Sequence, residues 1–147
     1  MKGAQIFVRT VVIAYALALM SVSAHAATIH LKADLKASAE VPPKDSHGTG
    51  TLTATLDTET NEFTYRVEFS GLTGPVVAAH FHGPAAPGAN AKPQVPVKGS
   101  PITSPIDGKA TLTPEQAKDL LAGEWYINFH TSANPGGEIR GQVLKSE

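Results

Sequence analysis

The stretch "GTLTATLDTETNEFTYRVEF" (residues 50–69) decides the fold, because it holds two alternating apolar patterns joined by a turn. In its first half Leu52, Ala54 and Leu56 alternate with threonines, and in its second half aromatic and branched residues alternate with polar ones. A two-residue period places one set of side chains on each face of a strand. The link "DTETN" (57–61) has the composition of a turn. The stretch therefore predicts an antiparallel hairpin with one buried face.

The same two-residue period recurs along the chain. Further strands are expected in "TIHLKADLK" (28–36), "PVVAAHFH" (75–82), "EWYINFH" (124–130) and "GEIRGQVLK" (137–145), and two short ones in "PQVPVKG" (93–99) and "GKATLT" (108–113). Seven or eight short strands predict a mainly β fold, an antiparallel β-sandwich of Greek-key type.

One short helix interrupts this pattern at "LTPEQAKDLLAG" (112–123). Thr113 is the expected N-cap, with Pro114 at the first helical position and Gln116 three residues after the cap. Gly123 is the expected stop signal. We expect this helix to connect two strands and to pack over an end of the sheet.

Residues 1–26 have the layout of a signal peptide. Lys2 and Arg9 give a positive start, an apolar stretch follows, and Ala24 and Ala26 stand at the small-residue positions of an Ala-x-Ala cleavage site. We therefore expect residues 27–147 to form one exported domain, periplasmic or secreted, with no stable membrane span after cleavage.

Charge and composition narrow the function. After removal of Lys2 and Arg9, 10 basic residues face 13 acidic ones, and no basic cluster remains, which argues against nucleic acid as a partner. The absence of cysteine excludes thiolate metal sites and thiol nucleophiles. Short enzyme motifs are absent as well, so an enzyme is the less favoured class.

Three histidines are the strongest candidates for chemistry. His80 and His82 are two residues apart, so they share a face of their strand at a spacing of about 6.6 Å. His130 ends a strand whose opposite face carries the apolar Trp125, Ile127 and Phe129. If the two strands are neighbours, three imidazoles form a cluster that suits copper or zinc. Spacing alone leaves a second interpretation open, in which these are histidines at strand ends without a metal.

Additional ligands or supporting groups are expected among five residues: His47, Tyr126, Asn128, Glu138 and Arg140. Tyr126 and Asn128 share the polar face of their strand with the third histidine. Glu138 would orient a ligand histidine, as carboxylates do in metal sites. Arg140 is expected as a solvated or cross-strand-paired charge, or as a cation that steers an anion toward a redox site. His47 would be a fourth ligand if its loop folded over the cluster.

Two motifs resemble the CHRD (chordin-type) domain found in exported bacterial proteins. "AAHFHGPAAPGANA" (78–91) is similar to the family's His-x-His block followed by glycines, and "NFHTSANPGGEIRGQ" (128–142) is similar to its Asn-x-His-Thr and Gly-Glu-Ile-Arg-Gly-Gln block. The resemblance spans about 29–143. It implies an immunoglobulin-like or superoxide-dismutase-like β-sandwich outside the cytoplasm. A more distant similarity to copper-zinc superoxide dismutases rests on the His-x-His pair, without their zinc loop or disulfide.

Three functional hypotheses follow. The first is an exported CHRD-type β-sandwich that binds one transition metal, copper in preference to zinc, through His80, His82 and His130 for metal carriage, storage or sensing. The alternative is a metal-free extracellular module that binds another extracytoplasmic protein. The third is a copper-dependent redox enzyme such as a dismutase.

Overall fold

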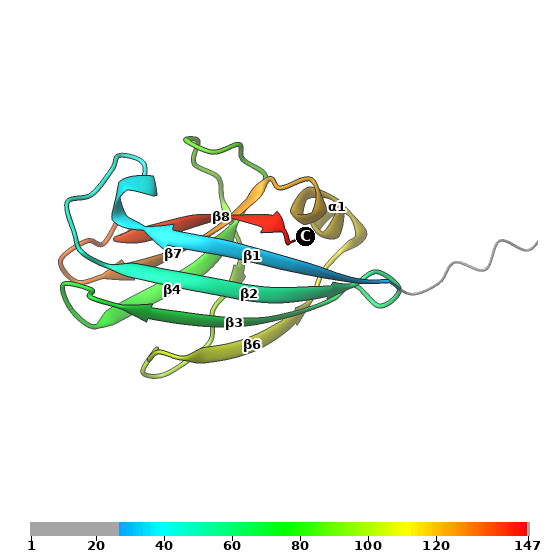
Figure 1. The fold of residues 1–147 in the computed structure, drawn as a ribbon, viewed down its shortest axis with the longest axis horizontal. Helices are drawn as coiled ribbons and strands as arrows, with labels where there is room; N and C mark the ends of the chain where they lie inside the picture. The colour runs from blue at the N-terminus through cyan, green and yellow to red at the C-terminus, as the bar shows by residue number, and fades with distance from the viewer. Residues whose placement is uncertain (1–26, 147) are drawn as a thin grey trace, which may run out of the picture.

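The computed structural model describes residues 27–146 of the chain, so the signal-peptide prediction lies outside the described residues. Eight strands and one α-helix follow one another in the order shown in Figure 1. The strands are β1 (Thr28–Lys36), β2 (Thr49–Asp57), β3 (Glu62–Ser70), β4 (Val76–His82), β5 (Pro93–Pro96), β6 (Ile106–Thr111), β7 (Trp125–Thr131) and β8 (Ile139–Lys145). The helix α1 spans Pro114–Leu121, and a 3-10 turn, η1, spans Ala37–Ala39.

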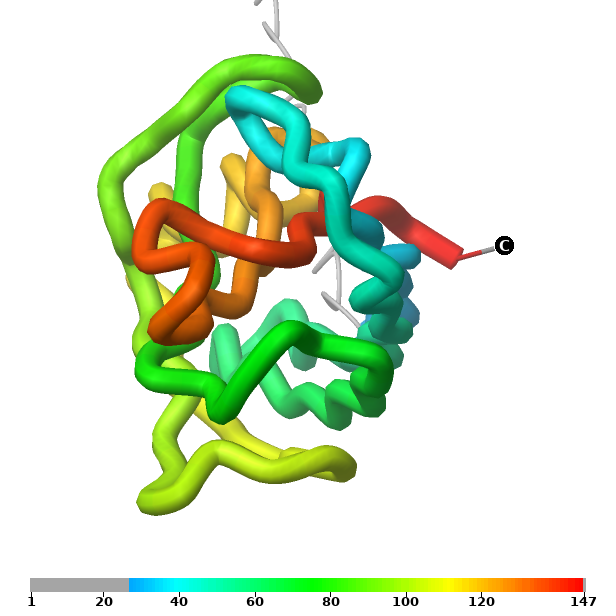
Figure 2. The backbone as a smooth tube through the Cα atoms, turned by 90° about the vertical axis from the view of Figure 1, so that its left-hand side faces the viewer, coloured from blue at the N-terminus to red at the C-terminus, as the bar shows by residue number. Residues whose placement is uncertain are grey.

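All eight strands belong to one antiparallel sheet in the order β5-β4-β7-β8-β1-β2-β3-β6. The sheet curls so that it is nearly closed, and its inner face surrounds the core (Figures 1 and 2). The expected hairpin is confirmed, with Leu56 paired to Phe63 across the turn and Thr49 paired to Ser70 at the far end. The mainly β, antiparallel prediction with one helix is therefore confirmed, while the Greek-key sandwich stays a prediction.

The core forms from the apolar sets that alternation predicted. In β2 and β3 the alternating apolar side chains are buried and the threonines and charges between them face outward. Phe63, Phe81 and Trp125 meet at the centre in edge-to-face and tilted contacts, with ring centroids 5.1–6.4 Å apart. Full burial of a large apolar side chain stabilises a fold by about 1.5–3 kcal/mol. The buried side chains of the inner face therefore supply most of the stability of these strands.

The helix α1 has the ends that its sequence predicts. Thr113 Oγ1 accepts a hydrogen bond from the backbone of Gln116, and the Gln116 side chain accepts one from the backbone of Thr113, which completes a capping box. Gly123 takes a positive φ of 76° after the last turn. Leu120 is fully buried and anchors the helix to the core. Among residues 27–146, no helix has the length and apolarity needed to cross a membrane.

Candidate metal centre

Pairing of β4 with β7 brings the three histidines together. The two strands run antiparallel, with His80 opposite Asn128 and Ala78 opposite His130. His80 and His82 lie on the outer face of β4, whose inner face carries the buried Phe81. One ring nitrogen of each histidine lies within 4.8 Å of those of the other two. The two strands are neighbours, so the condition set by the sequence is met and the three histidines form a cluster.

Each of the three rings carries a buried nitrogen without a hydrogen-bond partner in the described part of the chain. The ring centroids are 5.6 Å apart for His80 and His82, 5.4 Å for His80 and His130, and 6.4 Å for His82 and His130. His80 Nδ1, His82 Nε2 and His130 Nε2 are each shielded from solvent and have no hydrogen-bond partner among the described residues. Buried polar atoms are usually paired, so three unpartnered nitrogens in one cluster indicate a site for a shared ligand.

Two of the rings have their tautomer fixed by the backbone. His82 Nδ1 lies 3.0 Å from the carbonyl oxygen of Ala91, and His130 Nδ1 lies 2.9 Å from that of Pro135. A carbonyl oxygen only accepts, so each Nδ1 carries the hydrogen and each Nε2 keeps its lone pair. This is the arrangement in which proteins hold histidines that bind a metal.

The surroundings of two histidines favour the neutral, ligand-competent ring. Burial lowers the pKa of His80 below 6.5, and the neighbouring His130 and His82 lower it further. Burial also lowers the pKa of His82, and this outweighs the raising effects of the Ala91 carbonyl and of the Asn128 side chain, which lies close without completing a hydrogen bond. Both rings are therefore neutral at pH 7, as coordination requires.

The spacing of the nitrogens fits one ion after a small adjustment. At the upper limit of 4.8 Å, a point equidistant from three nitrogens is about 2.8 Å from each. Zinc binds imidazole nitrogen at about 2.0–2.1 Å, so each donor has to move inward by about 0.7 Å.

His82, Tyr126 and Arg140 form a stack of three side chains. The Tyr126 ring lies parallel to the His82 ring, with centroids 4.8 Å apart and an interplanar angle of 1°. The guanidinium carbon of Arg140 lies 3.4 Å from the centre of the Tyr126 ring. The two groups cannot share one face of the phenol at these distances, so Tyr126 is sandwiched between them. The Tyr126 hydroxyl accepts a hydrogen bond from the Ala91 amide, which makes it a support of the loop.

The loop 83–92 covers the other side of this stack, which changes the predicted role of Arg140. Arg140 donates to the Ala89 carbonyl at 2.6 Å and to Asn90 Oδ1 at 3.0 Å, and Asn90 in turn donates to the Val41 carbonyl. Figure 2 shows this loop passing beside the 37–47 segment. Arg140 is only 2% exposed and has no ion pair within residues 27–146. The prediction of a solvated or paired arginine is therefore wrong, because the loop closes over it.

A model of the CHRD domain family matches residues 31–143. The chain belongs to the CHRD domain family. The match runs from β1 to β8 and includes the histidine cluster, the stack and the covering loop, so the resemblance seen in the two sequence motifs is confirmed. Searches of the curated proteins and of the solved structures found no match.

A buried carboxylate that the sequence did not indicate approaches the CHRD cluster through Asn128. Asn128 Nδ2 donates to Glu40 Oε1 at 3.3 Å, and Glu40 is 4% exposed. Burial raises the pKa of Glu40, although Asn128 and the charge of Arg140 lower it in part. Gly137, at φ 118°, makes room for the carboxylate, because any side chain there would collide with it. Glu40 is the residue that caps the end of the 3-10 turn and stands outside any alternating pattern, so no local pattern indicates its burial.

Glu138 has another role in this CHRD domain than the predicted one. Its carboxylate accepts hydrogen bonds from Ser46 Oγ, from Thr131 Oγ1, and from both the amide and the hydroxyl of Thr73. Burial alone would raise its pKa, but these bonds together lower it to about 2. The carboxylate therefore connects the loops of Ser46 and Thr73 to the end of β7, and none of these bonds goes to a histidine. His47 is exposed and stands outside the three-histidine group.

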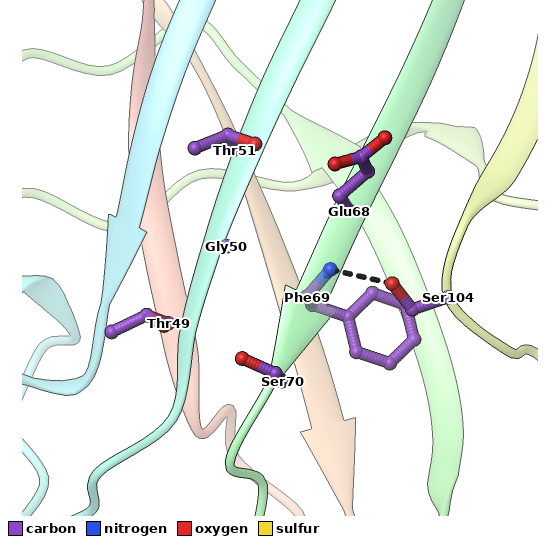
Figure 3. A pocket seen from close by; sticks show the side chains of 7 residues that line it. All are labelled: Thr49, Gly50, Thr51, Glu68, Phe69, Ser70 and Ser104. Carbon is purple, nitrogen blue, oxygen red and sulfur yellow. Dashed lines mark hydrogen bonds between the residues drawn. The ribbon is translucent and has the colours of Figure 1, made fainter.

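A hollow of about 340 Å³ on β2 and β3 lies apart from the histidines (Figure 3). Its floor is backbone and threonine, and at its side Ser104 Oγ accepts a hydrogen bond from the Phe69 amide. Its lining residues are Thr49, Gly50, Thr51, Glu68, Phe69, Ser70 and Ser104. Its lining residues include no histidine and one acidic side chain, that of Glu68.

Proposed function

We propose that this CHRD domain binds one transition-metal ion through His80, His82 and His130. The observation that carries the proposal is the convergence of three buried imidazole nitrogens without hydrogen-bond partners. A buried polar group without a partner costs about 1–3 kcal/mol, so three in one place form an unfavourable arrangement unless a ligand binds them. One cation coordinated by all three satisfies them together.

Copper is the preferred ion, and zinc is the alternative. The donor set is three neutral nitrogens, which suits copper and zinc and does not suit the oxygen-seeking calcium or magnesium. Copper binds such sites more tightly than zinc in the general order of divalent ions. Three protein ligands leave a further coordination position for a small ligand or an incoming donor, which fits metal carriage, storage or sensing.

The proposal places the protein in the periplasm or outside the cell. Its support is the signal-like composition of residues 1–26. A dismutase-like enzyme has less support, because the arginine expected to attract an anion is buried under loop 83–92.

The test is metal binding by the purified exported protein, stripped of metal and titrated with copper(II) or zinc. An ion that binds only the folded state stabilises it by about 2.7 kcal/mol at a hundred times its dissociation constant, so the melting temperature should rise with one ion per chain. The double variant His80→Ala, His82→Ala should lose this response. The matched double variant His30→Ala, His47→Ala, at exposed positions outside the cluster, should keep it. An equal response of both double variants would refute the proposal.

A further inference from the structure

The three histidines are not held equally. His82 and His130 each donate from Nδ1 to a backbone carbonyl, and His82 also stacks on Tyr126. Within residues 27–146, no hydrogen bond ties the ring of His80, and its Nδ1 is unpartnered. The rings of His82 and His130 are thus each held in one tautomer by a backbone carbonyl, whereas the ring of His80 is held only through its own strand.

The loosely held ring is also the one beside an open groove. A hollow of about 570 Å³ runs along β4 and the β5 edge, and His80 is the one cluster histidine among its lining residues. Val77, which is 60% exposed, and Pro96 line its walls, and Lys98 is the one cationic side chain among the lining residues. The groove therefore reaches the cluster on the side of His80, whereas His82 and His130 are not among its lining residues.

We propose that His80 is the exchangeable ligand of the site, and that the metal enters and leaves on its side by exchange with the imidazole of an incoming histidine. This rests on the proposed metal-binding function. In the exchange the incoming nitrogen forms a bond to the ion as the His80 bond breaks, with no change in oxidation state. An imidazole matches the three donors already in the site, and the positive Lys98 disfavours its protonated form. The partner is therefore a metal-donating or metal-accepting protein that presents a neutral histidine into the groove.

Chemical rescue tests the assignment directly. His80→Gly and His82→Gly each remove one ligand, and free imidazole is then offered to the copper(II)-loaded full-length exported protein. Imidazole should raise the copper affinity of His80→Gly at least tenfold, because the groove admits it. It should restore little in His82→Gly, where Tyr126 and loop 83–92 cover the ring. Isotope-labelled imidazole should show its nitrogen coupling in the electron paramagnetic resonance spectrum of the His80→Gly copper complex only.

A second measurement keeps the native ligands and so does not depend on the folding of the glycine variants. Val77→Trp narrows the groove, and we expect it to slow copper transfer to an imidazole-bearing chelator at least fivefold without changing copper affinity. Leu144→Trp is the matched control, since Leu144 is 50% exposed and lies outside the groove, and it should transfer copper at the wild-type rate.

The outcomes separate this inference from the proposed function. If the wild-type protein binds no copper, both fail. If it binds copper but imidazole rescues His82→Gly as well as His80→Gly, or if Val77→Trp and Leu144→Trp transfer copper equally fast, the exchangeable role of His80 is wrong while the metal site stands.

Discussion

Replacement of Glu138 by glutamine should destabilise the protein and remove part of its sensitivity to acid. The pKa of Glu138 is about 2 in the folded state against an ordinary 4.5, because hydrogen bonds from Ser46, Thr73 and Thr131 stabilise the charged form. A shift of one pKa unit corresponds to about 1.4 kcal/mol, so the charge contributes at most about 3 kcal/mol to stability at pH 7.

The pH window follows from the direction of the shift. The folded-state pKa lies below the unfolded one, so the contribution is complete above about pH 4.5 and is lost as the pH falls toward 2. Wild type should therefore lose stability in this window through Glu138, and Glu138→Gln should lack that part of the slope. Glutamine keeps the shape of the side chain but presents an NH₂ group to donors, so some of the four bonds are also lost.

Urea unfolding of the metal-free protein between pH 2 and pH 7 measures both effects. Glu59→Gln is the control, because Glu59 is an exposed residue of the β2–β3 turn, and it should change stability by less than about 0.5 kcal/mol. The reasoning would be refuted by a Glu138→Gln protein that is as stable as wild type at pH 7. Identical slopes for the two proteins below pH 4.5 would refute it as well.

Three further predictions concern the site and the helix. Tyr126→Leu removes the ring between His82 and Arg140 and should weaken copper binding about tenfold to a hundredfold. Tyr126→Phe keeps the stack and should lose much less copper affinity. Competition with a copper chelator measures both affinities. Copper affinity should fall as the pH drops and protons compete for the imidazole nitrogens, and burial, which lowers the pKa of His80 and His82, should move part of this fall to lower pH. An affinity independent of pH down to 4 would contradict histidine ligation. Thr113→Ala removes the helix cap and should lower the free energy of unfolding in urea by about 1 kcal/mol, with no change in metal affinity. A fall in both stability and metal affinity would show that the helix and the site are coupled.

Local patterns in the sequence predict much of the fold. The alternation in β2 and β3 places each apolar residue in the core because a strand exposes alternate side chains to alternate faces. The cap at Thr113 and the stop at Gly123 are likewise local, since both depend on a few backbone bonds. The His-x-His spacing puts His80 and His82 on one face for the same reason. What these patterns leave open is which strands become neighbours.

Contacts between distant segments explain the predictions that failed. Alternation places Arg140 on the outer face of β8, but loop 83–92 covers that face, and nothing local to Arg140 indicates this. Glu138 is likewise engaged by Ser46 and Thr73, from loops far away in sequence. Glu40 reaches Asn128 across 88 positions of the chain. Buried polar groups of this kind depend on the tertiary arrangement of loops, which periodicity does not encode.

The central claim is that three imidazoles bind one ion, and nitrogen couplings in the electron paramagnetic resonance of copper(II) test it most directly. With one equivalent of copper(II) added to the metal-free protein, the account predicts a single copper species with couplings from three histidine rings. One set should disappear in each of the single variants His80→Ala, His82→Ala and His130→Ala. A spectrum without histidine nitrogen couplings, or one that is the same in wild type and in all three variants, would contradict it.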